Sequence, residues 1–145
     1  RQQGSDEQAL GVLLEFMDLR TQVATKDGFS REASGILERL VKAVGYARDS
    51  VKEGRWAEGG VLDEQQLEER YNFLRLKLHE AEILWAENDF MGATRLAKLI
   101  VDKENGKEEP SRDFLIKAML RCGQWMAKSR TEGARNVLEK YLKPV

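Results

Sequence analysis

Cysteine and histidine are the side chains most often used for nucleophilic or metal chemistry, and this sequence of 145 residues contains one of each, Cys122 and His79. One cysteine excludes an internal disulfide, and a single Cys/His pair is too small a ligand set for a zinc site. Cys122 falls on an apolar helical face, which favours a small buried hydrophobe over a nucleophile. We therefore expect no metal, no cofactor and no catalytic residue in this chain.

Tryptophan could supply a stacking platform for a ligand, and Trp85 and Trp125 are the candidates for that role. Each follows apolar residues at helical spacing, and a tryptophan in such a place usually serves as core because it buries a large area. His79 lies at the rim of the same apolar stripe, between Leu78 and Glu80, so we expect a solvated or hydrogen-bonded histidine.

These residues are positioned by helices. Apolar residues recur at steps of three and four from Leu78 to Trp85, and a second set begins after the polar corner Glu87-Asn88-Asp89. The same pattern of residues recurs about 40 positions later, since Trp125 follows Trp85 by 40 positions and Gly133 follows Gly92 by 41. Such a period is typical of helical solenoids. The sequence predicts an all-α fold of tetratricopeptide- or HEAT-like hairpin repeats. The predicted repeat core comprises Leu78, Ala81, Trp85, Ala93, Leu96, Ile100, Ala118, Cys122, Trp125, Ala134, Val137, Leu138 and Tyr141.

The whole chain divides into three predicted hairpins within one segment, 1–145. They cover residues 5–51, 63–103 and 111–142, and the glycine-rich residues 52–62 connect the first two. In the second hairpin, one helix of about 25 residues runs from Asp63 through Trp85. In the third, a break near Ser129-Arg130-Thr131 separates two helices. The predicted N-caps are Ser5, Ser30, Asp63, Ser111 and Thr131.

Composition excludes several classes of function. Lys and Arg number 24 against 25 Asp and Glu, so there is no overall field to attract nucleic acid. No apolar run approaches the length of a membrane span, and the first residues lack the apolar core of a signal peptide. The lone cysteine is consistent with a reducing intracellular compartment. The absence of an initial methionine and the ending Lys-Pro-Val suggest a piece of a longer protein.

Four stretches carry a family resemblance: Glu80–Ala86, Leu99-Ile100, Arg121–Ala127 and Val137–Leu142. They resemble the FAT-region helical repeats of the ATM (ataxia-telangiectasia-mutated) type of phosphatidylinositol 3-kinase-related protein kinases. The most specific of them is the Cys-Gly-x-Trp-Met-Ala pattern at Cys122–Ala127. The resemblance extends from about Ala9 and is densest between Leu78 and Leu142.

This resemblance implies an α-solenoid that packs on neighbouring repeats and on the kinase lobes of the same parent chain. The parent would be a nuclear, homodimeric serine/threonine kinase that signals DNA double-strand breaks. The chain has no glycine-rich phosphate loop, no catalytic-loop Asp with its Asn, and no Asp-Phe-Gly, so phosphoryl transfer would belong to parts outside it. Thr21-Gln22 matches the dipeptide that such kinases phosphorylate, but it lies within a predicted helix, and we interpret it as chance.

Three hypotheses follow for function. The first is a non-catalytic scaffold segment of an ATM-like kinase, with no direct nucleic-acid or membrane contact. The second is a free-standing tetratricopeptide-like adaptor that binds a partner peptide or helix. The third is a small helical-bundle enzyme that uses Cys122. An adaptor is expected to have capping helices with polar outer faces, whereas a segment of a longer solenoid leaves apolar faces bare.

Overall fold

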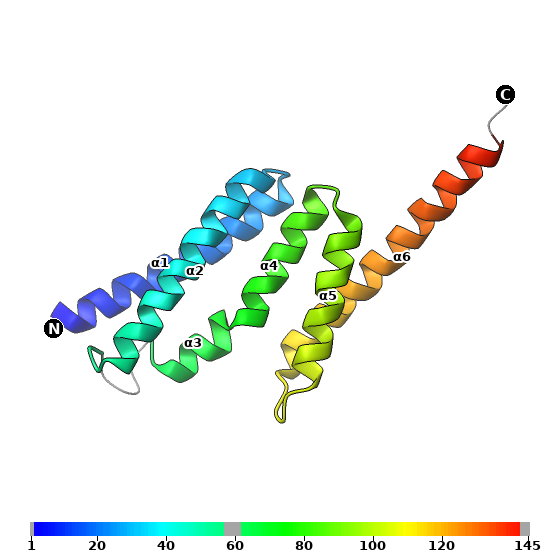
Figure 1. Cartoon of the computed structure of the whole chain (residues 1–145). Coiled ribbons are helices and arrows are strands. Elements are labelled where there is room, and N and C mark those ends of the chain that lie inside the picture. Colours follow the sequence, from blue (N-terminus) through cyan, green and yellow to red (C-terminus); the bar gives the residue numbers. More distant parts are fainter. Residues whose placement is uncertain (1, 57–61, 143–145) are drawn as a thin grey trace.

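A computed structural model describes residues 2–56 and 62–142, and the side chains of 2–5, 131–134, 136–137 and 141–142 are not described. Its elements are α1 (Gln2–Lys26), α2 (Ser30–Lys52), α3 (Glu64–Tyr71), α4 (Phe73–Ala86), α5 (Phe90–Asn105) and α6 (Arg112–Leu142) (Figure 1). No strand occurs in the described ranges. The fold is all-α, as predicted, whereas a solenoid of repeats stays a prediction.

α1 and α2 form an antiparallel pair joined by a tight turn. Gly28 has φ of +86°, a conformation that glycine adopts without strain, and the N–H of Phe29 closes the turn on the carbonyl of Ala24 at 2.8 Å. Two predicted caps are wrong. Ser30 is the first helical residue, and Phe29 occupies the N-cap without a side-chain hydrogen bond. α1 begins at Gln2, so Ser5 lies inside the helix.

The predicted long helix from Asp63 to Trp85 is in fact two helices, α3 and α4. Asp63 caps α3 as predicted, since its Oδ1 accepts from the N–H of Gln66 at 2.8 Å. Asn72 interrupts the helix with an extended backbone at φ −69° and ψ 167°. Its Oδ1 accepts from the N–H of Arg75 at 2.9 Å, while its Nδ2 donates to the carbonyl of Glu68 at 2.8 Å. One asparagine side chain therefore ends α3 and starts α4.

α4 and α5 meet at the polar corner that the sequence indicated. Asn88 takes φ of 69°, and Asp89 caps α5 through a 3.0 Å hydrogen bond from the N–H of Gly92. The turn between α5 and α6 is organised by Glu104, which is 1% exposed. Its carboxylate accepts from Lys107 Nζ at 2.9 Å and from the N–H of Ser111 at 2.8 Å. A buried carboxylate is stabilised here because both oxygens have donors.

The third predicted hairpin does not form, because residues 112–142 form a single helix of 31 residues in place of two helices joined by a turn. α6 continues through Ser129, Arg130 and Thr131 without a break, so Thr131 is not an N-cap. α6 contains two glycines, Gly123 and Gly133, and no proline, and an internal glycine costs a helix only about 1 kcal/mol. The second half of α6 extends away from the other helices (Figure 1).

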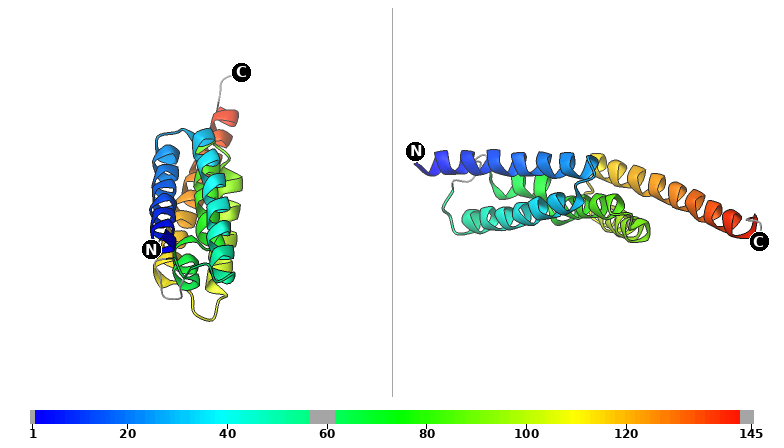
Figure 2. Two further views of the ribbon diagram at one scale, coloured as in Figure 1. Left: turned by 90° about the vertical axis from the view of Figure 1, so that its left-hand side faces the viewer. Right: turned by 90° about the horizontal axis from the view of Figure 1, so that it is seen from above.

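The helices pack in two layers. Seen from above, α1 and then α6 follow one edge of the molecule, while α2, α4 and α5 form the other layer (Figure 2). One core cluster joins α1, α2, α3 and α4, with Leu14, Leu40, Val44 and Leu67 at its centre. Two smaller clusters join α4, α5 and α6. α4 contributes to all three clusters, so it separates one half of the fold, α1 to α3, from the other, α5 and α6.

Candidate functional site

The structure buries most of the predicted repeat core. Leu96 and Trp85 are half-buried, and Leu138 is 57% exposed, which contradicts its prediction. Leu138 is exposed because α6 runs straight on and no other element of the described residues packs against this part of it. The side chains of Ala134, Val137 and Tyr141 lie outside the described residues. The buried members are Leu78, Ala81, Ala93, Ile100, Ala118, Cys122 and Trp125.

Trp85 and Trp125, predicted as cores of two separate repeats, stack directly on each other. Their ring centroids are 5.2 Å apart and their planes differ by 7°. The ring of Phe90 also packs on Trp85, with ring centroids 4.5 Å apart. The stack joins the end of α4 to the middle of α6 over the buried alanines Ala81, Ala93 and Ala97. No sequence signal pairs the two tryptophans, because each has the spacing of its own helix.

Cys122 behaves as a buried hydrophobe. Its Sγ lies 3.8 Å from the sulfur of Met126. Burial raises the pKa of the Cys122 thiol, with Lys98 opposing and Asp102 assisting that rise. The thiolate, which is the nucleophilic form, is therefore disfavoured at neutral pH. The geometry gives no support to an enzyme that uses this residue.

His79 connects two helices. Its Nε2 lies 2.5 Å from Oδ1 of Asp18, so a side chain of α4 contacts one of α1 across 61 residues of sequence. Thr21, the candidate phosphorylation site, is fully buried, and its hydroxyl donates to the carbonyl of Met17 at 2.7 Å. A kinase could not reach this hydroxyl in the folded chain.

The sequence reasoning missed an exposed apolar stripe on α1, which we call the α1 stripe: Val12, Phe16, Leu19 and Val23. These side chains are 67%, 58%, 56% and 54% exposed, and their spacing of four, three and four residues places them on one helix face. The opposite face holds Leu14 and Thr21, both fully buried in the fold's own core. α1 is thus apolar on two faces, and only one of them is covered by this chain.

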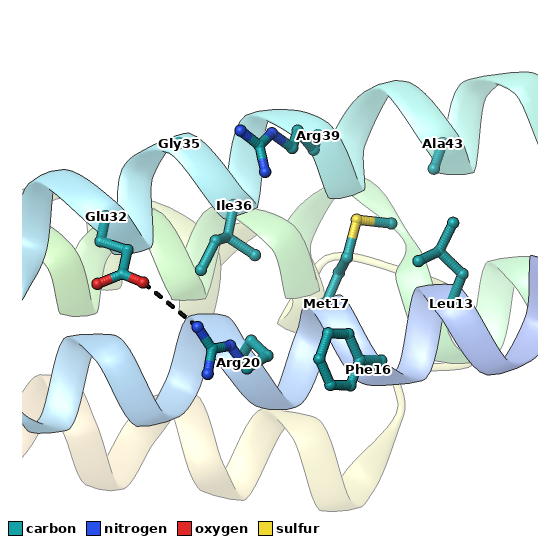
Figure 3. Close-up of a pocket in the computed structure, with 9 residues that line it drawn as sticks. All are labelled: Leu13, Phe16, Met17, Arg20, Glu32, Gly35, Ile36, Arg39 and Ala43. Carbon is teal, nitrogen blue, oxygen red and sulfur yellow. Dashed lines mark hydrogen bonds and ion pairs between the residues drawn. The ribbon is translucent and has the colours of Figure 1, made fainter.

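A groove of about 720 Å³ lies beside the stripe, between α1 and α2. Leu13, Met17 and Ile36 point into it, and an ion pair of 3.3 Å between Arg20 and Glu32 crosses one end (Figure 3). A side chain at Gly35 would meet no atom within 4 Å, so the α2 wall is open at that point. Arg20 and Glu32 are both half-exposed, and such a pair contributes little stability.

This arrangement supports recognition by packing more than it supports catalysis. Among the described residues, no group of three or more His, Cys, Asp or Glu side chains could hold a metal ion. The described helices include none with the length and hydropathy needed to cross a membrane. The chemically distinctive surface is the α1 stripe with its adjoining groove.

The comparison with known proteins gives one partial similarity. Over 68 residues, or 47% of this chain, the sequence is 35% identical to the serine/threonine-protein kinase ATM of Arabidopsis thaliana. The matched part is 2% of that kinase, so the chain corresponds to a very small share of its length. No family model matches the chain. No solved structure matches it either.

Proposed function

We propose that this chain is a non-catalytic scaffold segment of the FAT region of an ATM-like serine/threonine protein kinase. It packs on neighbouring helical repeats and on the kinase domain of the same parent. The parent acts in nuclear DNA-damage signalling as a homodimer, and its catalytic domain lies outside this segment. The partial similarity to ATM and the family resemblance of Cys122–Ala127 support this assignment.

The α1 stripe is the observation that carries the proposal. Four large apolar side chains on one face over about three turns are unusual for a surface helix, which normally presents polar residues to solvent. A helix that is apolar on two faces fits between two layers, as an internal helix of a repeat array does. In the parent, the α1 stripe would therefore contact a helix of a neighbouring repeat.

The experiment places two charges in the stripe of the parent kinase, Phe16→Glu with Leu19→Glu. Because both side chains are exposed in this chain, the isolated segment should keep its stability to within about 0.5 kcal/mol. The parent should lose soluble yield and kinase activity, since two carboxylates would be buried at a helix contact.

A matched control uses Met91→Glu with Leu99→Glu on α5, where the side chains are 71% and 48% exposed. This pair adds the same charge at an unrelated surface. The proposal fails if the parent tolerates the α1 pair, or if the α5 pair is equally damaging.

A free-standing adaptor is the second candidate, and the groove between α1 and α2 favours it. An amphipathic helix of a partner could place apolar side chains against Leu13, Met17 and Ile36. The same variants distinguish the two. An adaptor would be monomeric with its natural α1 stripe, whereas an isolated scaffold segment should self-associate through the stripe as its concentration rises. The Phe16→Glu, Leu19→Glu variant of that segment should then be monomeric.

A further inference from the structure

A second groove lies on a different part of the molecule, where the ends of α1 and α4 meet the middle of α6. Its volume is about 640 Å³. α1 contributes its last turn and the turn residue Gly28, α4 its last two turns, and α6 one face at residues 117–125. Nothing in the proposed scaffold function uses this groove, which shares no lining residue with the groove between α1 and α2.

The groove is rich in cations. Lys26, Lys117 and Arg121 line it, against a single carboxylate, Glu82. Glu82 is only 17% exposed at its side chain and already accepts from Arg121 Nε at 3.2 Å. Within the part of the chain that the structure describes, no carboxylate lies within ion-pair distance of Lys26 or Lys117. This local excess contrasts with the whole sequence, whose net charge is −1.

The backbone around the groove does not oppose an anion. Helix ends expose carbonyl oxygens that repel negative charge, and two helices end here. At α1, the carbonyls of Ala24 and Thr25 accept from the N–H groups of Phe29 and Gly28. At α4, the carbonyl of Trp85 accepts from the N–H of Asn88 at 3.0 Å. Because these acceptors are occupied, the two helix ends repel an anion less than bare carbonyls would.

An aromatic surface completes the site. Trp85 and Trp125 both line the groove, and their mutual stacking fixes them in place. Lys128 extends the cationic side, with Nζ lying 5.7 Å from the ring of the half-buried Trp85. Cations beside a rigid apolar surface match a ligand that combines carboxylates with a hydrophobic side chain.

We propose that this groove binds an acidic peptide segment of a partner protein, in which Asp or Glu residues flank an apolar or aromatic residue. The apolar residue lies against the half-buried Trp85. The carboxylates pair with Lys26, Lys117 and Lys128. Because the groove is open and its lysines are solvated, binding is weakened by salt.

The test uses a fluorescein-labelled peptide in which glutamates flank a Leu-Phe pair, titrated with the whole chain and followed by fluorescence anisotropy. The expected result is saturable binding that weakens as salt rises from about 50 mM to about 500 mM. The double variant Lys26→Glu with Lys117→Glu should weaken binding at least about tenfold, because attraction becomes repulsion at two positions. A matched peptide with glutamine in place of glutamate should bind the unchanged chain no more tightly than the glutamate peptide binds the double variant.

The control reverses two exposed lysines outside the groove, Lys103→Glu with Lys140→Glu, and changes the net charge by the same amount. Binding should be reduced less than about twofold by this control. The proposal is overturned if the peptide does not bind, if both double variants weaken binding equally, or if the glutamine peptide binds as tightly. Circular dichroism of the variants confirms that each chain is folded. None of these outcomes depends on the α1 stripe.

Discussion

The two halves of the fold, on either side of α4, close their cores with different side chains. The half built from α1, α2 and α3 uses branched aliphatic residues, such as Leu14, Leu40 and Val44, spread along the whole length of the helices. The half built from α5 and α6 has one cluster of large residues, such as Ile100 and Phe114, and a second cluster in which the buried alanines Ala93 and Ala97 are covered by stacked tryptophans.

This difference determines where each half is vulnerable. A distributed aliphatic core loses a modest amount at each truncated side chain, because its neighbours remain in contact. A core of alanines depends on a few large residues that fill the space beyond them. The alanine cluster of the α5–α6 half should therefore concentrate its stability in few positions, while the α1–α2 half should share it among many.

The largest effect is expected at Trp125, which is 6% exposed. Trp125→Ala should lower the free energy of unfolding by about 3 to 5 kcal/mol, the range for truncating a large buried aromatic. Trp56→Ala is the comparison in the other half. Trp56 is half-buried and contacts Tyr46 edge-on at 6.4 Å, so its loss should be clearly smaller. Urea unfolding of both variants measures the difference. Equal losses would contradict the claim that the two halves distribute their stability differently.

A double-mutant cycle measures the coupling free energy between the stacked Trp85 and Trp125. Trp85→Ala alone should cost less than Trp125→Ala, because Trp85 is only half-buried. The two losses should not add, since each variant removes the same ring contact, and a coupling of about 0.5 to 1.5 kcal/mol is expected for an aromatic pair. Additive losses would mean that the tryptophans act separately, as two independent repeats would require.

Each half also contains a buried carboxylate that accepts from a backbone N–H, and the two should differ. Glu104 has two donors, whereas Glu7 accepts from one donor among the described residues, the N–H of Leu62 at 2.8 Å. Glu104→Ala should cost about 1 to 3 kcal/mol, because it leaves the turn before α6 without its acceptor. Glu7→Ala should cost less. Glu108→Ala, an exposed control in the same turn as Glu104, should change stability by less than about 0.5 kcal/mol.

The junction between the halves has its own test, at Asn72. Asn72→Ala should cost about 1 kcal/mol, since it removes the N-cap of α4 and the bond to the carbonyl of Glu68. Asn72→Asp keeps the cap acceptor and should lose less. Denaturant unfolding provides the measurement. A gain of stability in Asn72→Ala would show that one continuous helix, as the sequence pattern indicated, is accessible to the chain.

The smallest effect concerns Cys122 and alkaline pH. Burial raises the pKa of its thiol, so the folded chain holds this proton more firmly than the unfolded chain does. The resulting stabilisation is fully present below the pKa of a free cysteine, about 8.5, and is lost as pH rises through the higher folded value. Cys122→Ser should flatten the decline in stability above about pH 8.5. Native Cys122 should also react slowly with iodoacetamide, and rapid labelling would contradict its burial.

Local signals in the sequence were enough to place several helix ends. Asp63, and Asp89 in the corner before Phe90, have side chains that cap the next helix. The break at Asn72 was missed because apolar residues continue in helical register through Tyr71 and Leu74. The long α6 was missed for the opposite reason, since Thr131 resembled a cap although nothing forced the helix to end.

The candidate surfaces were harder to predict, because they depend on which residues meet in space. On α1, Leu13 and Leu14 are adjacent apolar residues of the same type, yet Leu13 is 47% exposed and Leu14 is fully buried. The helix has apolar residues on two faces, and periodicity alone does not say which face this chain covers. The pairing of Trp85 with Trp125 joins elements 40 residues apart, which no local pattern encodes.

The second half of α6 has a consequence for hydrogen exchange. Beyond Ser129, the described side chains are exposed, and α6 has extensive contact only with α5. The 13 residues 130–142 form about 20 Å of helix, a length that is marginal by itself in water. Their amides can open by fraying in about a microsecond, whereas those near Phe114 and Ala118 need the core to open. The amides of α6 should therefore exchange at two different rates, fast in residues 130–142 and slow near Phe114 and Ala118. Slower exchange in residues 130–142 would indicate that another surface has bound there.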